Sequence, residues 1–247
     1  EGNVTVTIQY IGYKTAIKNL NLEKFNYKNA DLILGQSNEI LNHIRTITIT
    51  TDLFLYRNFP DIQPPQLIDR QKPQGGKIKL VYAGLLGVAQ GILKLCKQLD
   101  YQNVELHIYG SGAEEHQIKD FIKRHREFPI VFHGRVERIV LHQTLLNYDI
   151  AIIPLLNRIY GSVPSKLFEY SKLGLPMVYF GGGEGESIVI NNSLGWIAKE
   201  GNYDDLNKTI QSIKTEELDF KKKQSIQKVA VTVFNFKAQL EGLKAIL

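Results

Sequence analysis

The sequence predicts an α/β fold built on a doubly wound, Rossmann-like parallel sheet. From Lys77 onward, short apolar segments typical of buried strands alternate with segments of helical periodicity, and the links between them are short. Glycine clusters follow several of these strands, as at 110–112 and 181–183. A regular βα alternation forms a parallel sheet with helices on both faces, and it places ligands at the carboxyl ends of the strands.

The elements of this sheet follow one another in a fixed order after Lys77. Each predicted strand is an apolar run bounded by glycine, proline or a polar loop, and the runs are 77–83, 104–109, 129–132, 149–154 and 176–180. A helix is predicted after each of these strands, at 90–99, 114–125, 137–146, 164–173 and 184–190. Cys96 falls within the pattern of the first helix, where we expect a half-buried apolar filler.

The residues before Lys77 are less regular. Residues 29–37 indicate a strand running into a helix that begins near Ser37, 53–56 indicate another strand, and 1–20 alternate like pieces of strand without an assigned place. The Pro-, Gln- and Gly-rich segment that follows is typical of a linker. We therefore expect an incomplete N-terminal α/β domain (1–60), a linker (61–76), a Rossmann-like domain (77–230) and a C-terminal helix packing back on the N-terminal part (231–247).

The composition is that of a soluble globular protein. Of 247 residues, 43% are hydrophobic and 22% are charged. No apolar run reaches membrane-spanning length, and the first residues do not resemble a signal peptide. The single cysteine excludes an intrachain disulfide and suits the reducing cytoplasm, where we expect the protein to lie.

The charge favours an anionic ligand or peripheral contact with an anionic membrane. The formal net charge is +5 and the pI is near 9.1. The basic residues are scattered and lack interleaved aromatic residues, which argues against nucleic acid. The one dense run, 221–223, is interpreted as a solvated helix face first and a membrane contact second. The sequence has no Asp-x-Asp motif, and its six histidines lack ligand spacing, so no metal site is expected.

The segment 161–170 carries the most specific chemistry. Pro164 suits the first position of a helix, so the amides of Ser165 and Lys166 should point out of the helix start. Together with the lysine ammonium and the helix dipole, these groups predict an anion site. Glu169 shares the helix face and would accept hydroxyl groups. An ordinary helix start with a Lys166–Glu169 surface ion pair explains the same residues, and only the surrounding α/β pattern favours the anion site.

With these residues in view, the chain resembles the family-4 retaining glycosyltransferases of the GT-B fold, above all bacterial enzymes that build surface polysaccharides such as capsule and lipopolysaccharide O-antigen. The resemblance covers roughly 29–200 and is carried by 81–91, 106–112, 132–136 with 149–155, and 163–170 followed by Gly174-Leu175-Pro176. It implies that 77–230 binds a nucleotide sugar and that 1–60 is the end of the acceptor-side domain.

The resemblance also implies the reaction and the roles of the donor-binding residues. A sugar would pass with retention from a UDP- or GDP-sugar to a glycan or polyprenyl-diphosphate-linked acceptor, without a metal or other cofactor. Glu169 would hold the ribose, Ser165 and Lys166 the diphosphate, and Val136 would line the base pocket. Gly84 and Gly87 would let the backbone pass close to the donor.

Two departures from the family pattern matter. Gly161 stands where the family has the first glutamate of its Glu-x7-Glu motif, so a carboxylate contact to the sugar is missing. Leu85 and Gln90 stand where many members have a basic pair. Lys166 would therefore have to balance more of the phosphate charge, with help from Arg135 or Arg158. In the family, the residues that activate the acceptor usually come from the N-terminal domain, whose opening glycine-rich loop is not visible in this sequence. We therefore name no catalytic base.

Three alternatives stay open at this point. Gly84, Gly87 and Gly91 after a strand resemble a dinucleotide fingerprint, but the acidic residue expected at the end of the second strand is absent, because that end reads Tyr109-Gly110. A sugar-nucleotide epimerase on the same fold would need a histidine and carboxylate pair for which no clear spacing exists. A non-catalytic nucleotide-sugar-binding module would need only the donor site.

Overall fold

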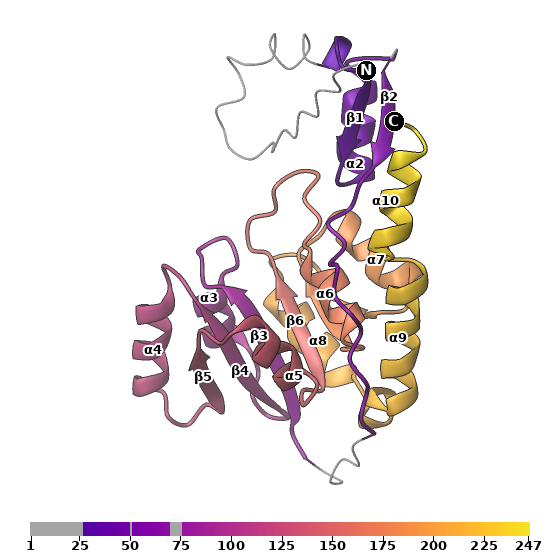
Figure 1. Ribbon diagram of the computed structural model, residues 1–247. Coiled ribbons are helices and arrows are strands. Elements are labelled where there is room, and N and C mark those ends of the chain that lie inside the picture. The colour runs from indigo at the N-terminus through magenta and orange to yellow at the C-terminus, as the bar shows by residue number, and fades with distance from the viewer. Residues whose placement is uncertain (1–26, 50, 70–75) are drawn as a thin grey trace.

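The computed structural model describes residues 27–49, 51–69 and 76–247, and the expectation for 1–20 lies outside them. The described chain forms two parallel sheets, one of two strands and one of six (Figure 1). The strands of the larger sheet are β3 (Ile78–Leu85), β4 (Val104–Ser111), β5 (Ile130–Gly134), β6 (Ile150–Pro154), β7 (Met177–Phe180) and β8 (Gly195–Ile197). Their spatial order is β5-β4-β3-β6-β7-β8.

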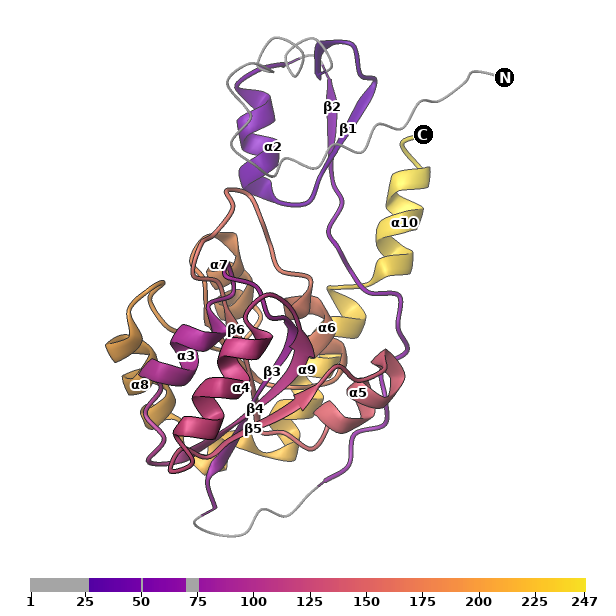
Figure 2. The ribbon, with the colours of Figure 1, turned by 90° about the vertical axis from the view of Figure 1, so that its left-hand side faces the viewer.

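The helices of the larger unit cover both faces of this sheet, as Figure 2 shows. They are α3 (Ile92–Gln98), α4 (Glu115–Arg124), α5 (Arg138–Leu145), α6 (Lys166–Lys172), α7 (Glu184–Asn191), α8 (Tyr203–Ser212), the 3-10 helix η1 (Thr215–Leu218) and α9 (Phe220–Thr232). Strand residues alternate between two cores, so Leu80 and Tyr82 pack with α3, α4 and α8, whereas Val81 and Ala83 pack with α5, α6, α7 and α9. The predicted doubly wound fold is confirmed.

The strand order reverses between β3 and β6, which pair in parallel from Leu80 and Val81 to Ile150 and Ala151. In open α/β sheets, ligands bind outside the carboxyl ends of the strands at such a switch point. We call this place, bordered by the segments that follow β3 and β6, the crevice. Its β3 side is fixed by a close backbone approach, because a Cβ on Gly110 would lie 1.8 Å from the Gly84 carbonyl oxygen.

The start of α6 differs from the prediction. The helix begins at Lys166 with Ser165 as its N-cap, so Pro164 lies outside the helix and not at its first position. Similarly, α3 begins at Ile92 and not at residue 90, because Gly91 takes a left-handed conformation with φ +63° as its N-cap. Both helices therefore begin slightly later in the chain than the apolar periodicity indicates.

β8 and α8 have no counterpart among the predicted strands and helices. β8 has only three residues and begins at Gly195, which makes it too short for a strand pattern. Cys96 is fully buried and not half-buried, since it packs in the core between α3 and the sheet.

The smaller unit consists of β1 (Leu32–Gly35), α2 (Asn38–Arg45) and β2 (Asp52–Leu55). Ser37 caps α2 by accepting the amide of Ile40 at 3.1 Å, as expected of a serine N-cap. The C-terminal helix α10 (Phe236–Lys244) runs towards this unit (Figure 1). Its Gln239 side chain makes two hydrogen bonds with the backbone of Arg57, at 2.8 and 2.9 Å. The domain boundaries themselves stay a prediction.

The segment 56–69 connects the two units without a helix or strand. It packs along the larger unit. The Phe59 ring lies 4.9 Å from that of Phe168 and 5.6 Å from that of Phe234, between centroids. Further along, the Pro65 carbonyl accepts a hydrogen bond from the Gln227 side chain at 2.9 Å. The segment therefore contacts α6, α9 and the turn that follows α9.

The basic run at 221–223 is not the uniformly solvated face that the sequence indicated. Lys223 donates to the carbonyl oxygens of Leu146 and Tyr148, at 3.4 and 3.0 Å, and so holds α9 to the end of α5. The Lys222 ammonium lies 5.6 Å from the centroid of the Trp196 ring, and of the three lysines only Lys221 is exposed. In the part of the chain that is described, no helix combines the length and apolarity needed to cross a membrane.

Candidate functional site

Lys166 extends across the crevice from the β6 side to the β3 side. A Cβ built on Gly84 would lie 2.6 Å from the lysine Cε and 3.1 Å from its Nζ. The lysine side chain therefore occupies the space that any side chain at position 84 would need. This explains the glycine at the end of β3 and places an ammonium group at the switch point.

The Lys166 ammonium is partly buried and forms no ion pair with any described residue. The ammonium lies 5.5 Å from the centroid of the Tyr170 ring. Burial lowers the pKa of Lys166, and the Glu169 charge offsets only part of this effect. The amides of Ser165 and Lys166 likewise donate to no acceptor among the described residues. An unpaired, desolvated cation beside two unused amides fits an anion.

Glu169 is held by two side chains of α5 and not by Lys166. Its Oε1 lies 2.7 Å from His142 Nε2 and 3.5 Å from an Arg138 nitrogen. The interpretation as a Lys166–Glu169 ion pair is therefore wrong. Burial raises the pKa of Glu169, but the hydrogen bond from His142 and the charges of Lys166 and Arg138 outweigh it, so the pKa is lowered. The carboxylate stays ionised at neutral pH and acts as an acceptor.

Sequence reasoning missed His142 and Arg138 as partners of this carboxylate. The two residues are four apart on α5, a spacing that puts them on one helix face. That spacing is the only local signal, because Glu169 lies 27 residues beyond His142.

The loop after β3 brings Gly87 and Gln90 together. A Cβ on Gly87 would lie 2.7 Å from the Gln90 Oε1. This oxygen is buried and accepts no hydrogen bond within the described structure. The Leu156 amide donates to the Ala89 carbonyl at 2.8 Å and joins this loop to the one after β6. The Gln90 oxygen is thus an unused acceptor in the crevice loop, and such atoms normally have partners.

Arg158 and Gly161 lie together on the loop after β6 and share a partner from the smaller unit. Arg158 Nη1 lies 2.7 Å and the Gly161 amide 2.9 Å from Glu39 Oε2. Gly161 has φ +71°, and a Cβ on it would lie 2.3 Å from Ile40 Cγ1. Arg158 is therefore engaged by a carboxylate here, and its role as a phosphate helper stays a prediction.

Val136 and Arg135 lie between β5 and α5. Val136 is partly buried and packs against the core that includes α6. Arg135 is exposed and forms no ion pair with a residue of the described chain. Their assignments to the base pocket and the phosphates stay predictions, as does that of the Ser165 hydroxyl, which makes no capping bond.

The histidines of β4 and β5 form a stacked polar cluster. His107 Nδ1 lies 2.9 Å from His133 Nε2, and its Nε2 lies 2.8 Å from Glu105 Oε1. Within residues 27–49, 51–69 and 76–247, no group of three or more His, Cys, Asp or Glu side chains is arranged to hold a metal. The cluster is a hydrogen-bonded network on the sheet.

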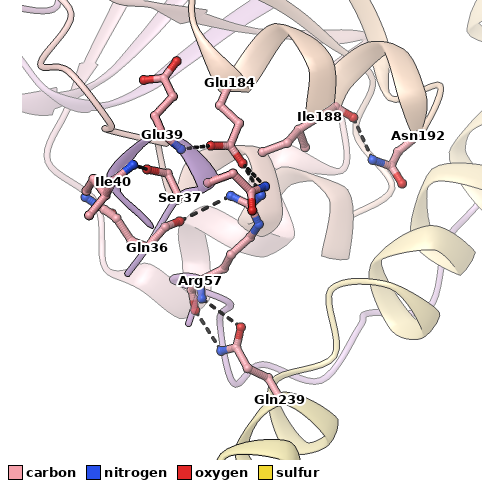
Figure 3. Close-up of polar contacts among 10 residues, drawn as sticks. Gln36, Ser37, Glu39, Ile40, Arg57, Glu184, Ile188, Asn192 and Gln239 are labelled. Atoms are coloured by element: carbon pink, nitrogen blue, oxygen red, sulfur yellow. Dashed lines mark hydrogen bonds and ion pairs between the residues drawn. The ribbon is translucent and has the colours of Figure 1, made fainter. Parts of the chain in front are cut away.

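A cavity of about 670 Å³ lies between α2, α7 and the junction of α9 with α10, and its lining includes Glu39 but not Lys166. Its charged residues include Arg57 and Glu184, which pair with each other (Figure 3). The described residues that line this cavity therefore offer no free cation. Lys166 in the crevice, by contrast, forms no ion pair with a described residue.

The fold and the site define a class: an α/β protein with a lysine and two amides at its switch-point crevice that have no partner among the described residues. The chain belongs to the glycosyl transferases group 1 family, whose model matches residues 66–230. No curated protein sequence matches the chain significantly. The family resemblance inferred from the motifs is thus confirmed at this level.

Solved structures show the same GT-B fold. A mutant of S. aureus TarM, in complex with fondaparinux, alpha-GlcNAc-glycerol and UDP, has a TM-score of 0.71 at 15% identity, over 93% of this chain and 46% of that one. Pneumococcal O-GlcNAc transferase GtfA, in complex with UDP and GlcNAc, has a TM-score of 0.67 at 21% identity, over 91% of this chain and 46% of that one. Sucrose-phosphate synthase from Thermosynechococcus elongatus has a TM-score of 0.75 at 16% identity, over 93% of this chain and 60% of that one. This chain spans about half the length of TarM and GtfA.

Proposed function

We propose that the chain binds the donor of a retaining glycosyltransferase, which moves a sugar from a UDP- or GDP-sugar to a glycan or lipid-linked acceptor in bacterial surface-polysaccharide synthesis. The observation that carries this proposal is the Lys166 ammonium, which is unpaired among the described residues and lies over Gly84 at the switch point. A nucleotide diphosphate would supply the missing negative charge.

The neighbouring groups support the same assignment. The unused amides of Ser165 and Lys166 would bind phosphate oxygens at the start of α6. Glu169, ionised and oriented by His142, would accept the ribose hydroxyls. UDP is present in the complexes of TarM and GtfA named above.

The chemistry would be electrostatic. As the bond between sugar and diphosphate breaks, negative charge grows on the leaving phosphate, and Lys166 with the helix amides would stabilise it without a metal. Donors fixed before the reaction need no reorganisation at that moment.

Calorimetric titration with UDP, GDP, their sugars and NAD tests the proposal. We expect UDP or GDP and the matching sugar nucleotide to bind, and the sugar nucleotide to be hydrolysed or to lose its sugar to an acceptor. Binding without turnover would favour a non-catalytic module. Binding of NAD alone would contradict the proposal.

His142→Ala is expected to weaken UDP binding about three- to tenfold, because Glu169 loses the hydrogen bond that orients it. The pKa of Glu169 should also rise towards its ordinary value, so the loss should grow as the pH falls. Calorimetry at pH 5 to 8 measures both effects. His116→Ala on α4, an exposed histidine paired with Asp120, is the matched control and should bind UDP as the wild type does. Equal affinity in both variants would reject the role of His142.

A further inference from the structure

Glu39 belongs to the smaller unit, yet its carboxylate lies on the loop after β6. It is the second residue of α2. Its Oε2 accepts the Gly161 amide at 2.9 Å and Arg158 Nη1 at 2.7 Å. Its Oε1 accepts no hydrogen bond from any residue that the structure describes, and the side chain is 25% exposed. One oxygen is therefore fixed by two donors, and the other is free.

The backbone that carries Glu39 is fixed on α7. The Glu39 amide donates to Glu184 Oε2 at 3.2 Å, and the Asn38 side chain donates to Glu184 Oε1 at 2.9 Å. Arg57 pairs with the same carboxylate. Figure 3 shows the Glu39 side chain turning away from Glu184. The carboxylate of Glu39 is thus pre-oriented by contacts that do not involve its own oxygens.

The loop that receives Glu39 borders the crevice. It follows β6, it is hydrogen-bonded to the loop after β3 through Leu156 and Ala89, and it leads into Ser165 and Lys166. Position 161 itself supplies no side chain, because Ile40 of α2 fills the space beside it. The carboxylate beside position 161 therefore comes from α2, and it also borders the cavity lined by Arg57 and Glu184.

We propose that Glu39 binds a hydroxyl group of the donor sugar through its free Oε1, and so contributes to the choice of sugar from outside the nucleotide-binding unit. The inference rests on the proposed function, since it requires a sugar nucleotide in the crevice. An ionised carboxylate is an acceptor that sugar hydroxyls match, and hydrogen bonds to it are stronger than those to neutral groups. Arg158 offsets its charge without occupying the free oxygen.

Glu39→Gln is the test. The amide oxygen of glutamine can keep the contacts with Gly161 and Arg158, which leaves an NH2 group where the free oxygen was. We expect UDP to bind the variant within about twofold of the wild type, and the better bound of UDP-glucose and UDP-N-acetylglucosamine to bind about tenfold more weakly. Calorimetry gives the ratio of the UDP and sugar-nucleotide dissociation constants, which a purely structural role would not change.

Glu115→Gln is the matched control, because the Glu115 side chain is similarly exposed, at 31%, and pairs with Lys119 on α4 and not with any residue around Glu39. The ratio of the UDP and sugar-nucleotide dissociation constants of this control should equal that of the wild type. An unchanged ratio in Glu39→Gln, or an equal loss in both variants, would overturn the inference. Wild-type protein that binds neither UDP nor GDP would instead refute the proposed function, and wild-type protein that binds UDP no more weakly than either sugar nucleotide would refute the role of Glu39 alone.

Discussion

Lys166→Met is expected to weaken UDP binding about hundredfold, because the substitution removes a desolvated ammonium that would make charge-assisted hydrogen bonds to the diphosphate. Methionine keeps the length of the side chain over Gly84, so the packing at the end of β3 should remain. Calorimetry with UDP measures the loss.

The same substitution is expected to stabilise the nucleotide-free protein. Burial lowers the pKa of Lys166, which means that the folded state disfavours the charged form. The resulting destabilisation is present while the lysine is charged in the unfolded chain, and it vanishes above the ordinary lysine pKa. Thermal unfolding at pH 7 should therefore show a higher midpoint for Lys166→Met.

Lys172→Met is the matched control for Lys166→Met. Lys172 lies on the same helix, is buried, and has a pKa lowered by burial as well, but it lies at the far end of α6. Its replacement should leave the UDP affinity unchanged. Wild-type affinity in Lys166→Met, or an equal loss in both variants, would contradict the assignment of the diphosphate to the start of α6.

Arg57→Met is expected to lower the free energy of unfolding by about 3 kcal/mol, because it leaves a buried carboxylate without its cation. The side chains of Arg57 and Glu184 are 11% and 10% exposed. Arg57 also donates to the Gln36 carbonyl at 3.3 Å (Figure 3). The pair joins the segment after β2 to the start of α7, so its loss should also loosen the contact between the two units.

The stabilisation that the Arg57–Glu184 pair provides should depend on pH. Burial raises the pKa of Glu184, but Arg57 and the donors from Asn38 and Glu39 outweigh it, so the pKa is lowered. This carboxylate stabilises the wild type above its unfolded pKa, and the contribution is lost as the pH falls through the folded pKa. In Arg57→Met the difference from wild type should shrink on acidification. Urea unfolding from pH 4 to 8 measures this.

Lys244→Met is the control for Arg57→Met. Lys244 pairs with Glu241 on α10, and both side chains are more than half exposed. Its loss should change the free energy of unfolding by at most about 0.5 kcal/mol. A comparable loss in the two variants, or no loss in Arg57→Met, would show that the buried pair does not stabilise the junction.

The larger sheet could be predicted from the sequence because its strands are buried on both faces and therefore appear as continuous apolar runs. The run 149–154 corresponds to β6, whose residues are all buried. β8 escaped prediction because three partly buried residues carry no such run. The start of α6 was misplaced because Pro164 fits both a first helical position and the residue before a cap.

The arrangement of the candidate site could be predicted only where its residues are close in the chain. Lys166 and Glu169 belong to one helix turn, and the glycines mark strand ends, so local patterns predict them. The partners of these groups come from elsewhere: His142 from α5, and Glu39 from a position 122 residues before Gly161. Such contacts depend on tertiary packing, and no local pattern encodes them.

A crystal structure of the chain with UDP tests the central claim most directly. We expect phosphate oxygens within hydrogen-bond distance of Lys166 Nζ and of the amides of Ser165 and Lys166, with ribose hydroxyls bound to Glu169. UDP bound instead in the cavity beside Arg57 and Glu184, or bound in the crevice with Lys166 still lacking an anionic partner, would contradict it.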